Sequence, residues 1–245
     1  MKHLGEDLDI HAGGIDNAFP HHTNEIAQSE SYLGHKWCNY WFHVMHLNDE
    51  SGKMSKSKGD FLTVSLLEKK GYDPMAYRLF CLQSHYRKNL VFTWENLDNA
   101  VIAYNKLVAK IATFKAEGEV DEKAFADLKA RFRKALDGDL NTSVAVTALY
   151  DVLKAKCNDA TKLALIADFD YVLSLNLISA AEALLKKQAE EEAANADPEI
   201  DALVAARTEA KKAKNWAEAD RIRDELKSRG IEIIDTPQGA KWRRI

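Results

Sequence analysis

Residues 53–57 of the chain read Lys53-Met54-Ser55-Lys56-Ser57, with Gly52 and Gly59 on either side. Two lysines separated by two residues, beside small hydroxyl side chains and flexible glycines, indicate a mobile loop with two positive charges. Such a loop suits the negative charge that develops on a leaving pyrophosphate, because it would stabilise that charge electrostatically. Short motifs also occur by chance, so the alternative interpretation is a solvated surface loop.

Upstream of this loop, residues 9–16 read Asp9-Ile10-His11-Ala12-Gly13-Gly14-Ile15-Asp16. Apolar residues followed by two glycines predict the end of a strand at which the backbone approaches a ligand closely. Asp16, just past such a turn, is suited to accept hydrogen bonds from ribose hydroxyls. The alternative is an ordinary glycine turn in which Asp16 caps a helix.

The next segment reads Phe19-Pro20-His21-His22-Thr23-Asn24-Glu25. Pro20 favours the first turn of a helix that we expect to extend to about Ser31, which places His21 and Glu25 four residues apart on one face. This is metal-ligand spacing, although an isolated pair of this kind is more often a surface hydrogen bond. Cys38 could supply a further ligand, and a buried structural thiol is the alternative.

Taken together, these segments resemble the second half of a class I aminoacyl-tRNA synthetase catalytic domain, and specifically the cysteinyl-tRNA synthetase family. Ala12 stands where the glycine run of that family often begins. The resemblance covers essentially the whole chain through Asn39-Tyr40-Trp41, Tyr77-Arg78, His85-Tyr86-Arg87, Glu95-Asn96-Leu97, Asp139-Leu140-Asn141-Thr142, Asp235-Thr236-Pro237-Gln238-Gly239 and Trp242-Arg243-Arg244. The family's histidine-rich nucleotide signature and two zinc-binding cysteines are missing ahead of Asp9, so we expect an N-terminally truncated fragment.

The resemblance implies one zinc ion per full-length protein and a site for ATP, taken up with Mg²⁺ as substrate. Zinc in this family is held by two cysteines, the first of the paired histidines and the following glutamate, so His21 and Glu25 would supply half of the site here. His22 would lie beside the metal ligand, or else be a structural histidine bonded to nearby backbone. Lys53 and Lys56 would be catalytic. The residues expected to contact ATP are His11, Gly14, Asp16, Lys53, Ser55 and Lys56.

The implied function is ATP-dependent activation of cysteine to cysteinyl-adenylate and transfer to the 3′ end of the cysteine tRNA. The expected partners are that tRNA, L-cysteine and ATP, and we expect a cytoplasmic monomer that is inactive as this chain alone. The alternatives are a ligase that joins cysteine to an amino-sugar inositol and a free-standing tRNA-binding fragment. The helical extension and the tail Trp242-Arg243-Arg244, expected to contact RNA, argue against the former.

Composition is consistent with a globular chain, at 46% hydrophobic and 29% charged residues over 245 positions. No run approaches the ~20 apolar residues of a membrane span, and no apolar stretch that would make a signal peptide follows the charged start, so we expect no membrane association. Cys38, Cys81 and Cys157 lack any Cys-x-x-Cys pairing, which favours reduced thiols.

The fold expected is α/β followed by mainly α. Residues 1–60 would form the C-terminal part of a Rossmann-type domain, with a buried strand from Trp37 to Leu47 ahead of the lysine loop. Residues 61–96 would form a stem-contact-like segment whose helices break at Gly71-Tyr72-Asp73-Pro74. Residues 97–190 show helical apolar spacing and predict a bundle of about four helices, which the resemblance implies is a tRNA- and anticodon-binding domain. Residues 197–245 would form a small α+β module, which the resemblance implies recognises the anticodon.

This last module is predicted to contain two helices around Trp216 and a hairpin of Ile231–Ile234 with Ala240–Ile245. The overall net charge of −4 does not by itself indicate a nucleic-acid binder. From Leu203 onward, however, eleven lysines and arginines outnumber seven acids. A mildly basic segment with Trp216 or Trp242 exposed would suit phosphate contact and base stacking. A salt-bridged, solvated helix pair is the alternative.

Overall fold

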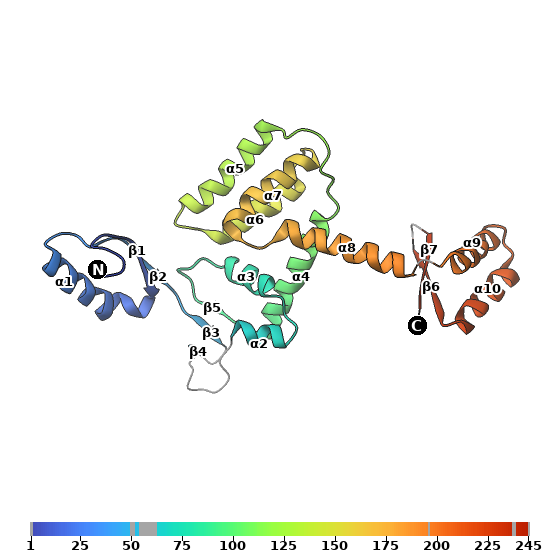
Figure 1. Ribbon diagram of the computed structural model, residues 1–245, viewed down its shortest axis with the longest axis horizontal. Helices are drawn as coiled ribbons and strands as arrows, with labels where there is room; N and C mark the ends of the chain where they lie inside the picture. The colour runs from blue at the N-terminus through green and yellow to red at the C-terminus, as the bar shows by residue number, and fades with distance from the viewer. Residues whose placement is uncertain (1, 50–51, 54–62, 196, 237–238, 245) are drawn as a thin grey trace. The chain divides into compact units, whose positions relative to one another are not determined.

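A computed structural model of the chain describes residues 2–49, 52–53, 63–195, 197–236 and 239–244 (Figure 1). The chain divides into two compact units, Met1–Ala181 and Glu182–Ile245. The boundary falls within helix α8, which covers Leu177–Asn195. Short sheets at both ends of the chain and helices between them confirm the predicted class, α/β followed by mainly α.

The first unit begins with a βαβ arrangement. Strands β1 (Leu8–Gly14) and β2 (Cys38–Val44) pair in parallel, and helix α1 (Thr23–Leu33) connects them. Two short turns of helix, η1 (Ile15–Asn17) and η2 (Ala18–His22), lead from β1 into α1. A parallel pair needs such a crossover, since its strands run in the same direction.

Two local predictions for this region need correction. The strand predicted for Trp37 to Leu47 ends at Val44, and a separate strand β3 covers Leu47–Asp49. It is also not a buried strand: Cys38 is its only buried residue and Tyr40 is 71% exposed, because β1 is its only strand partner among the described residues. The helix predicted from Pro20 begins at Thr23 instead, since Pro20 lies inside the η2 turn.

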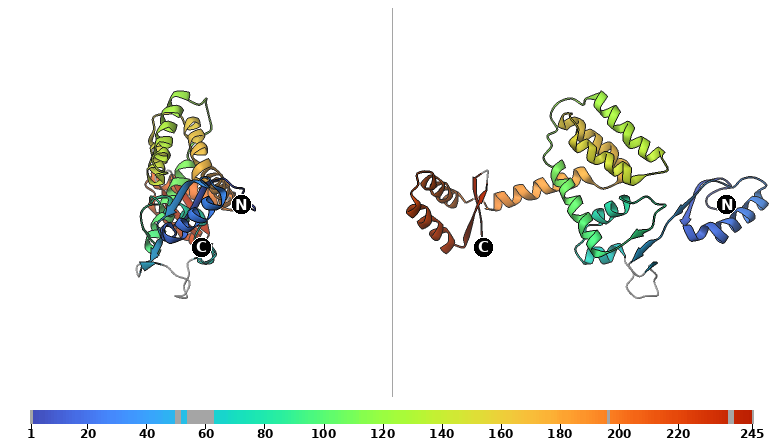
Figure 2. Two further views of the ribbon diagram at one scale, coloured as in Figure 1. Left: turned by 90° about the vertical axis from the view of Figure 1, so that its left-hand side faces the viewer. Right: turned by 180° about the vertical axis from the view of Figure 1, so that it is seen from behind.

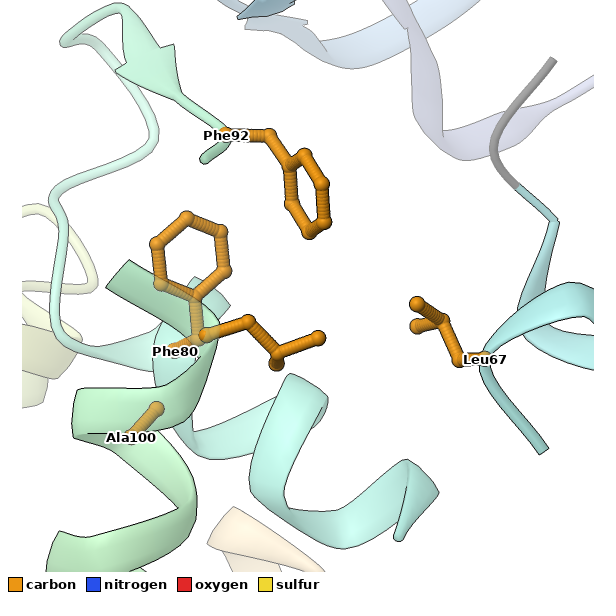
Figure 3. Close-up of a cluster of buried hydrophobic side chains, with 5 residues drawn as sticks. Leu67, Phe80, Phe92 and Ala100 are labelled. Carbon is orange, nitrogen blue, oxygen red and sulfur yellow. The ribbon is translucent and has the colours of Figure 1, made fainter. Parts of the chain in front are cut away.

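Strand β3 is central in a three-stranded sheet and leads toward the lysine loop. It pairs antiparallel with β4 (Gly52–Lys53) and parallel with β5 (Leu90–Val91). Helices α2 (Val64–Lys69) and α3 (Pro74–Leu82) lie on either side of the predicted break, and Pro74 itself is the first residue of α3. Leu67, Phe80, Phe92, Leu97 and Ala100 form the hydrophobic cluster that joins these elements to the following helix (Figure 3).

The predicted helical bundle is present in the first unit. It comprises α5 (Glu122–Asp137), α6 (Thr142–Lys154) and α7 (Asp159–Leu173), while the preceding α4 (Trp94–Ile111) packs against α3. Helices α5, α6 and α7 contact one another and lie side by side in both sets of views (Figures 1 and 2). Each helix begins at a polar cap, and the rings of Phe132 and Phe169 stack with centroids 4.0 Å apart in the core.

Two long-range hydrogen bonds connect α3 and α4 to the corner between α7 and α8. The Arg78 side chain donates to the Leu173 carbonyl at 2.6 Å, and the Tyr104 hydroxyl donates to the Leu175 carbonyl at 2.9 Å. The Leu173 carbonyl belongs to the last turn of α7, where carbonyls lack a partner within the helix, and the Leu175 carbonyl lies between α7 and α8. The contacts therefore fix the α7–α8 corner onto elements that occur much earlier in the sequence.

The second unit has its own core. Helices α9 (Pro198–Lys212) and α10 (Trp216–Ser228) pack against the antiparallel hairpin of β6 (Ile231–Thr236) and β7 (Gly239–Arg244). Both the two helices and the hairpin confirm the sequence predictions. The core of this unit consists of Ile200, Val204, Ile222, Leu226 and Ile231.

Among the described residues, no single helix is long and apolar enough to cross a membrane. The segments Asp159–Leu173 and Leu177–Glu191 are long and apolar enough only when taken together, and they meet at a bend of 118°.

Candidate functional site

Four histidine and glutamate side chains gather on one face of the β1–β2 pair, beside α1. His11 Nε2 on β1 lies 2.7 Å from Glu25 Oε2 in the first turn of α1. His22 Nδ1, at the end of η2, lies 2.8 Å from His43 Nε2 on β2. Because successive side chains of a strand point to opposite faces, the β1–β2 register brings His11 and His43 to the same face.

His22 is the most buried member of this group, at 3% exposure. Burial lowers its pKa, and the neighbouring imidazoles of His11 and His43 lower it further because a second positive charge there would be repelled. A neutral imidazole keeps a nitrogen lone pair for a ligand. The hydrogen bond to His43 occupies Nδ1 of His22 and leaves Nε2 available.

His11, His22 and Glu25 present one ligand atom each, all within 4.8 Å of one another. Two imidazole nitrogens and a carboxylate oxygen are ligands that zinc accepts, and three protein ligands with an open fourth position are typical of zinc sites that bind substrate. The donor set therefore fits a zinc ion. Trp41 packs against the rings of both histidines, with centroids 5.0 Å away in each case.

His21, which the sequence predicted as a metal ligand with Glu25, lies at the edge of this group. Its side chain is 64% exposed and its Nε2 is 3.7 Å from Glu25 Oε1. The structure thus brings Glu25 together with His11 and His22 rather than grouping it most closely with His21. Cys38 is buried, and its thiol donates to the Tyr40 carbonyl at 3.3 Å. Nothing in the local sequence spacing pairs His11 with Glu25; that contact depends on how α1 packs against β1.

The paired glycines lie directly beside the group. A Cβ on Gly13 would meet Asn17 Nδ2 at 2.7 Å and His22 Cε1 at 2.9 Å. A Cβ on Gly14 would meet Asp16 Oδ1 at 2.5 Å. At Gly13 a side chain would therefore clash with the buried ring of His22, whereas at Gly14 it would require the Asp16 carboxylate to move. Asp16 is about half exposed, and His46 Nε2 lies 3.6 Å from its Oδ1.

The lysine loop is described only at its start. Lys53 is opposite Asn48 in the β3–β4 pair, and its side chain lies outside the described part of the chain. Ser55 and Lys56, predicted to contact ATP, also lie outside the described residues.

The residues predicted to contact RNA lie on β7. The Trp242 indole is partly buried against the core of the second unit and donates to Asp201 Oδ1 at 2.7 Å. Arg243 forms a salt bridge with Glu232 across the hairpin. Arg244 is opposite Ile231, and its side chain is not among those described. Trp216, at the first position of α10, is 60% exposed.

Many cations of the second unit have acidic neighbours. Arg221 pairs with Glu218 and Glu225, and Arg229 pairs with Glu199 and Glu225. Exposed pairs of this kind contribute little to stability and rearrange readily. Part of the surface of this segment is therefore the salt-bridged helix pair that the sequence offered as an alternative. The ring of Trp216 is exposed beside it.

Both units of the chain contain segments that match known protein families. Residues 1–102 match the family described as the tRNA synthetases class I (C) catalytic domain, and residues 193–243 match the cysteinyl-tRNA ligase anticodon binding domain. The chain is 43% identical over 259 aligned residues to a cysteine–tRNA ligase of Caldicellulosiruptor saccharolyticus and 40% identical over 256 to one of Brevibacillus brevis. Each alignment covers 100% of this chain and 54% of the relative.

Among solved structures, the LeuRS of Agrobacterium radiobacter K84, in a ternary complex with tRNA and LeuAMS, superposes with a TM-score of 0.50 at 17% identity. The match covers 72% of this chain and 27% of that one, and it supports the fold alone. The fold and the sequence matches place the chain among the class I aminoacyl-tRNA synthetases. Within that class it belongs to the cysteinyl-tRNA synthetase family. The chain spans about half the length of the curated relatives it matches.

Proposed function

We propose that the chain serves in cysteine–tRNA ligation, in which cysteine is activated by ATP to cysteinyl-adenylate and then transferred to the 3′ end of the cysteine tRNA. The observation that carries this proposal is the compact donor group of His11, His22 and Glu25 beside the paired glycines. This group would hold a metal ion that prefers thiols. It lies next to the Gly13-Gly14 turn, where the lack of side chains would let a nucleotide approach the backbone.

The proposed division of labour follows from chemistry. The cysteine carboxylate attacks the α-phosphate of ATP, and the bond to the β-phosphate breaks. Gly14 allows close approach of the adenosine, and Asp16 accepts hydrogen bonds from its ribose. Lys53 and Lys56 neutralise the pyrophosphate as it leaves, with Mg²⁺ accompanying the ATP. Ser55, between the lysines, is a further proposed contact with ATP, as is His11.

A zinc ion held by His11, His22 and Glu25 would supply a soft acceptor that binds a cysteine thiolate much better than a serine hydroxyl. His43 fixes the ring orientation of His22 through Nδ1, and Glu25 balances positive charge at the site. The exposed His21 remains a proposed ligand that would have to turn inward to join them.

Substitution by cobalt tests this proposal on the chain itself. We expect Co²⁺ to bind and to develop a sulfur-to-cobalt absorption band when cysteine is added, and no such band with serine. Loss of Co²⁺ binding in His22→Gln together with retention in His21→Gln would support the donor group of His11, His22 and Glu25. Loss in His21→Gln with retention in His22→Gln would favour the pair His21 and Glu25 predicted from the sequence. His35→Gln, at an exposed histidine away from the donor group, is the matched control. A band of equal strength with serine, or none with cysteine, would refute the proposal.

We also propose that the second unit binds the anticodon arm of the cysteine tRNA, which the match to an anticodon binding domain supports. The exposed ring of Trp216 is suited to stack on a base, and Trp242, Arg243 and Arg244 would contribute through the outer edge of β7. Filter binding across a salt series should show weaker binding after removal of residues 241–245, with a smaller difference at high salt. Equal binding to a tRNA with a changed anticodon would contradict specific recognition.

A free-standing tRNA-binding protein is the second candidate, because the anticodon-domain match concerns RNA contact and not catalysis. Specific tRNA binding without the cobalt–thiolate band would favour it. Cysteine-dependent signals without tRNA binding would favour the amino-sugar ligase. In each case we propose a cytoplasmic monomer, in keeping with three cysteines that form no disulfide.

A further inference from the structure

A cavity of about 340 Å³ lies within the first unit, away from the donor group. Its walls come from β2, β3, α3 and the turn between α5 and α6. Phe42, Leu47, Tyr77, Tyr86 and Leu140 are among the side chains that line it. The proposed ligation chemistry uses none of these residues.

The floor of the cavity is apolar and well packed. Leu47, Tyr77, Cys81 and Leu90 line it and also pack against the hydrophobic cluster of Figure 3. Burial raises the pKa of the Cys81 thiol, so this side chain stays neutral. An apolar lining offers few hydrogen-bond partners to water and favours an apolar guest.

The polar groups around the cavity differ in whether they already have partners. Thr142 Oγ1 donates to the Ser84 carbonyl at 3.3 Å, and the Tyr86 hydroxyl donates to Asp139 Oδ1 at 2.5 Å. The Lys88 ammonium, by contrast, has no ion pair or hydrogen bond within the described residues. A guest would therefore meet an apolar interior and a single unpaired cation at the rim.

Volume and shape narrow the chemistry of the guest. The cavity is open to solvent on one side, and its volume of about 340 Å³ exceeds the roughly 150 Å³ of an enclosed cavity that holds benzene, so it has room for two fused rings. Aromatic side chains in the lining favour a flat ring system through offset or edge contacts. The Phe42 ring already stacks on Tyr86, with centroids 4.2 Å apart. We propose that this cavity binds a bicyclic aromatic carboxylate, with its rings against the apolar lining and its carboxylate at Lys88.

Isothermal titration of the 245-residue chain with 2-naphthoate tests this proposal. We expect 2-naphthoate to bind at one saturable site. The flexible octanoate and the neutral 2-naphthalenemethanol should both bind more weakly than 2-naphthoate. Lys88→Gln should weaken 2-naphthoate about threefold to fivefold, as expected for one exposed charge pair, and leave the neutral alcohol unchanged. The matched control is Lys106→Gln on the exposed surface of α4.

A second variant fills the space directly. Val44→Phe places an aromatic ring at a partly exposed position in the cavity wall and should abolish binding. Val64→Phe, at an exposed position on α2, should leave binding unchanged. Circular dichroism confirms that each variant is folded. Absence of saturable binding, or an affinity unchanged in both Lys88→Gln and Val44→Phe, would overturn the proposal. Octanoate binding as tightly as 2-naphthoate would overturn the assignment of an aromatic guest.

Discussion

Asp139 shows how one side chain fixes a turn that the backbone alone would disfavour. Asp139 and Leu140 follow each other with positive φ angles of 63° and 52°, a conformation that residues with a side chain seldom adopt. The Asp139 carboxylate accepts hydrogen bonds from Arg87 Nε and the Tyr86 hydroxyl, each at 2.5 Å. These two hydrogen bonds, of which the one from Arg87 has the larger effect, lower the pKa of Asp139 from its ordinary value of 3.8 to about 2.

The sign of the pH dependence follows from that shift. Because the folded-state pKa is lowered, the carboxylate stabilises the fold above about pH 4, and this contribution is lost as the pH falls toward about 2. We expect Asp139→Asn to lower the urea midpoint at neutral pH, and its difference from the unmodified chain to shrink between about pH 4 and about pH 2. Asp151→Asn, at an exposed carboxylate, is the control. A difference that persists undiminished at pH 2 would contradict the assigned cause.

At the scale of elements, polar caps define where the bundle helices begin. Asn158 precedes α7 and accepts from the Thr161 backbone at 2.9 Å and from its hydroxyl at 2.6 Å, while its amide donates to the Glu119 carbonyl at 2.7 Å. Thr161 is fully buried, and its hydroxyl in turn accepts from the Asp121 backbone at the start of α5. One asparagine thus connects the starts of two helices.

Asn158→Ala should therefore lower the free energy of unfolding by about 2 kcal/mol, at the upper end for a lost cap, because the buried Thr161 hydroxyl also loses its acceptor. Denaturant unfolding followed by circular dichroism measures the change. Asn105→Ala, at an exposed position in α4, should have little effect. Similar losses for both variants would show that the cap is unimportant.

Helices of this kind could be predicted from sequence because their signals are local. The Asn141 cap before α6, the break before Pro74 and the hairpin from Ile231 all follow from neighbouring residues. The exposure of Tyr40 could not be predicted, since it depends on which elements cover β2. For the same reason the sequence suggested His21 through its spacing, whereas the contacts around His22 arise from packing between β1, β2 and η2.

At the scale of the whole chain, each unit has a separate hydrophobic core, so we expect calorimetry to resolve two unfolding transitions. Leu149→Ala, fully buried in α6, should lower only the transition of the first unit, and Ile222→Ala in α10 only that of the second. Each substitution should cost about 2–5 kcal/mol through lost burial and a new cavity. A single transition shifted by both variants would show that the units unfold together.

The exposed face of β1 and β2 leads to a prediction about activity. Parallel strands are normally covered on both faces, yet Ile10 and Tyr40 are 61% and 71% exposed. We therefore expect the 245-residue chain alone to show no cysteine-dependent ATP–pyrophosphate exchange. The Brevibacillus brevis relative, about twice as long, serves as the positive control. Clear cysteine-dependent exchange by the purified chain would contradict this expectation.

The bond from Arg78 to the Leu173 carbonyl has a consequence for the order of events during translation. The two residues are 95 positions apart, so α3 leaves the ribosome long before its partner is made. At about 5–20 residues per second, the interval is roughly 5–20 s. Throughout that time the nascent chain holds an arginine without its acceptor and apolar helix faces without their cover. Chaperones that act on growing chains would therefore meet α3 without this partner until residue 173 has emerged.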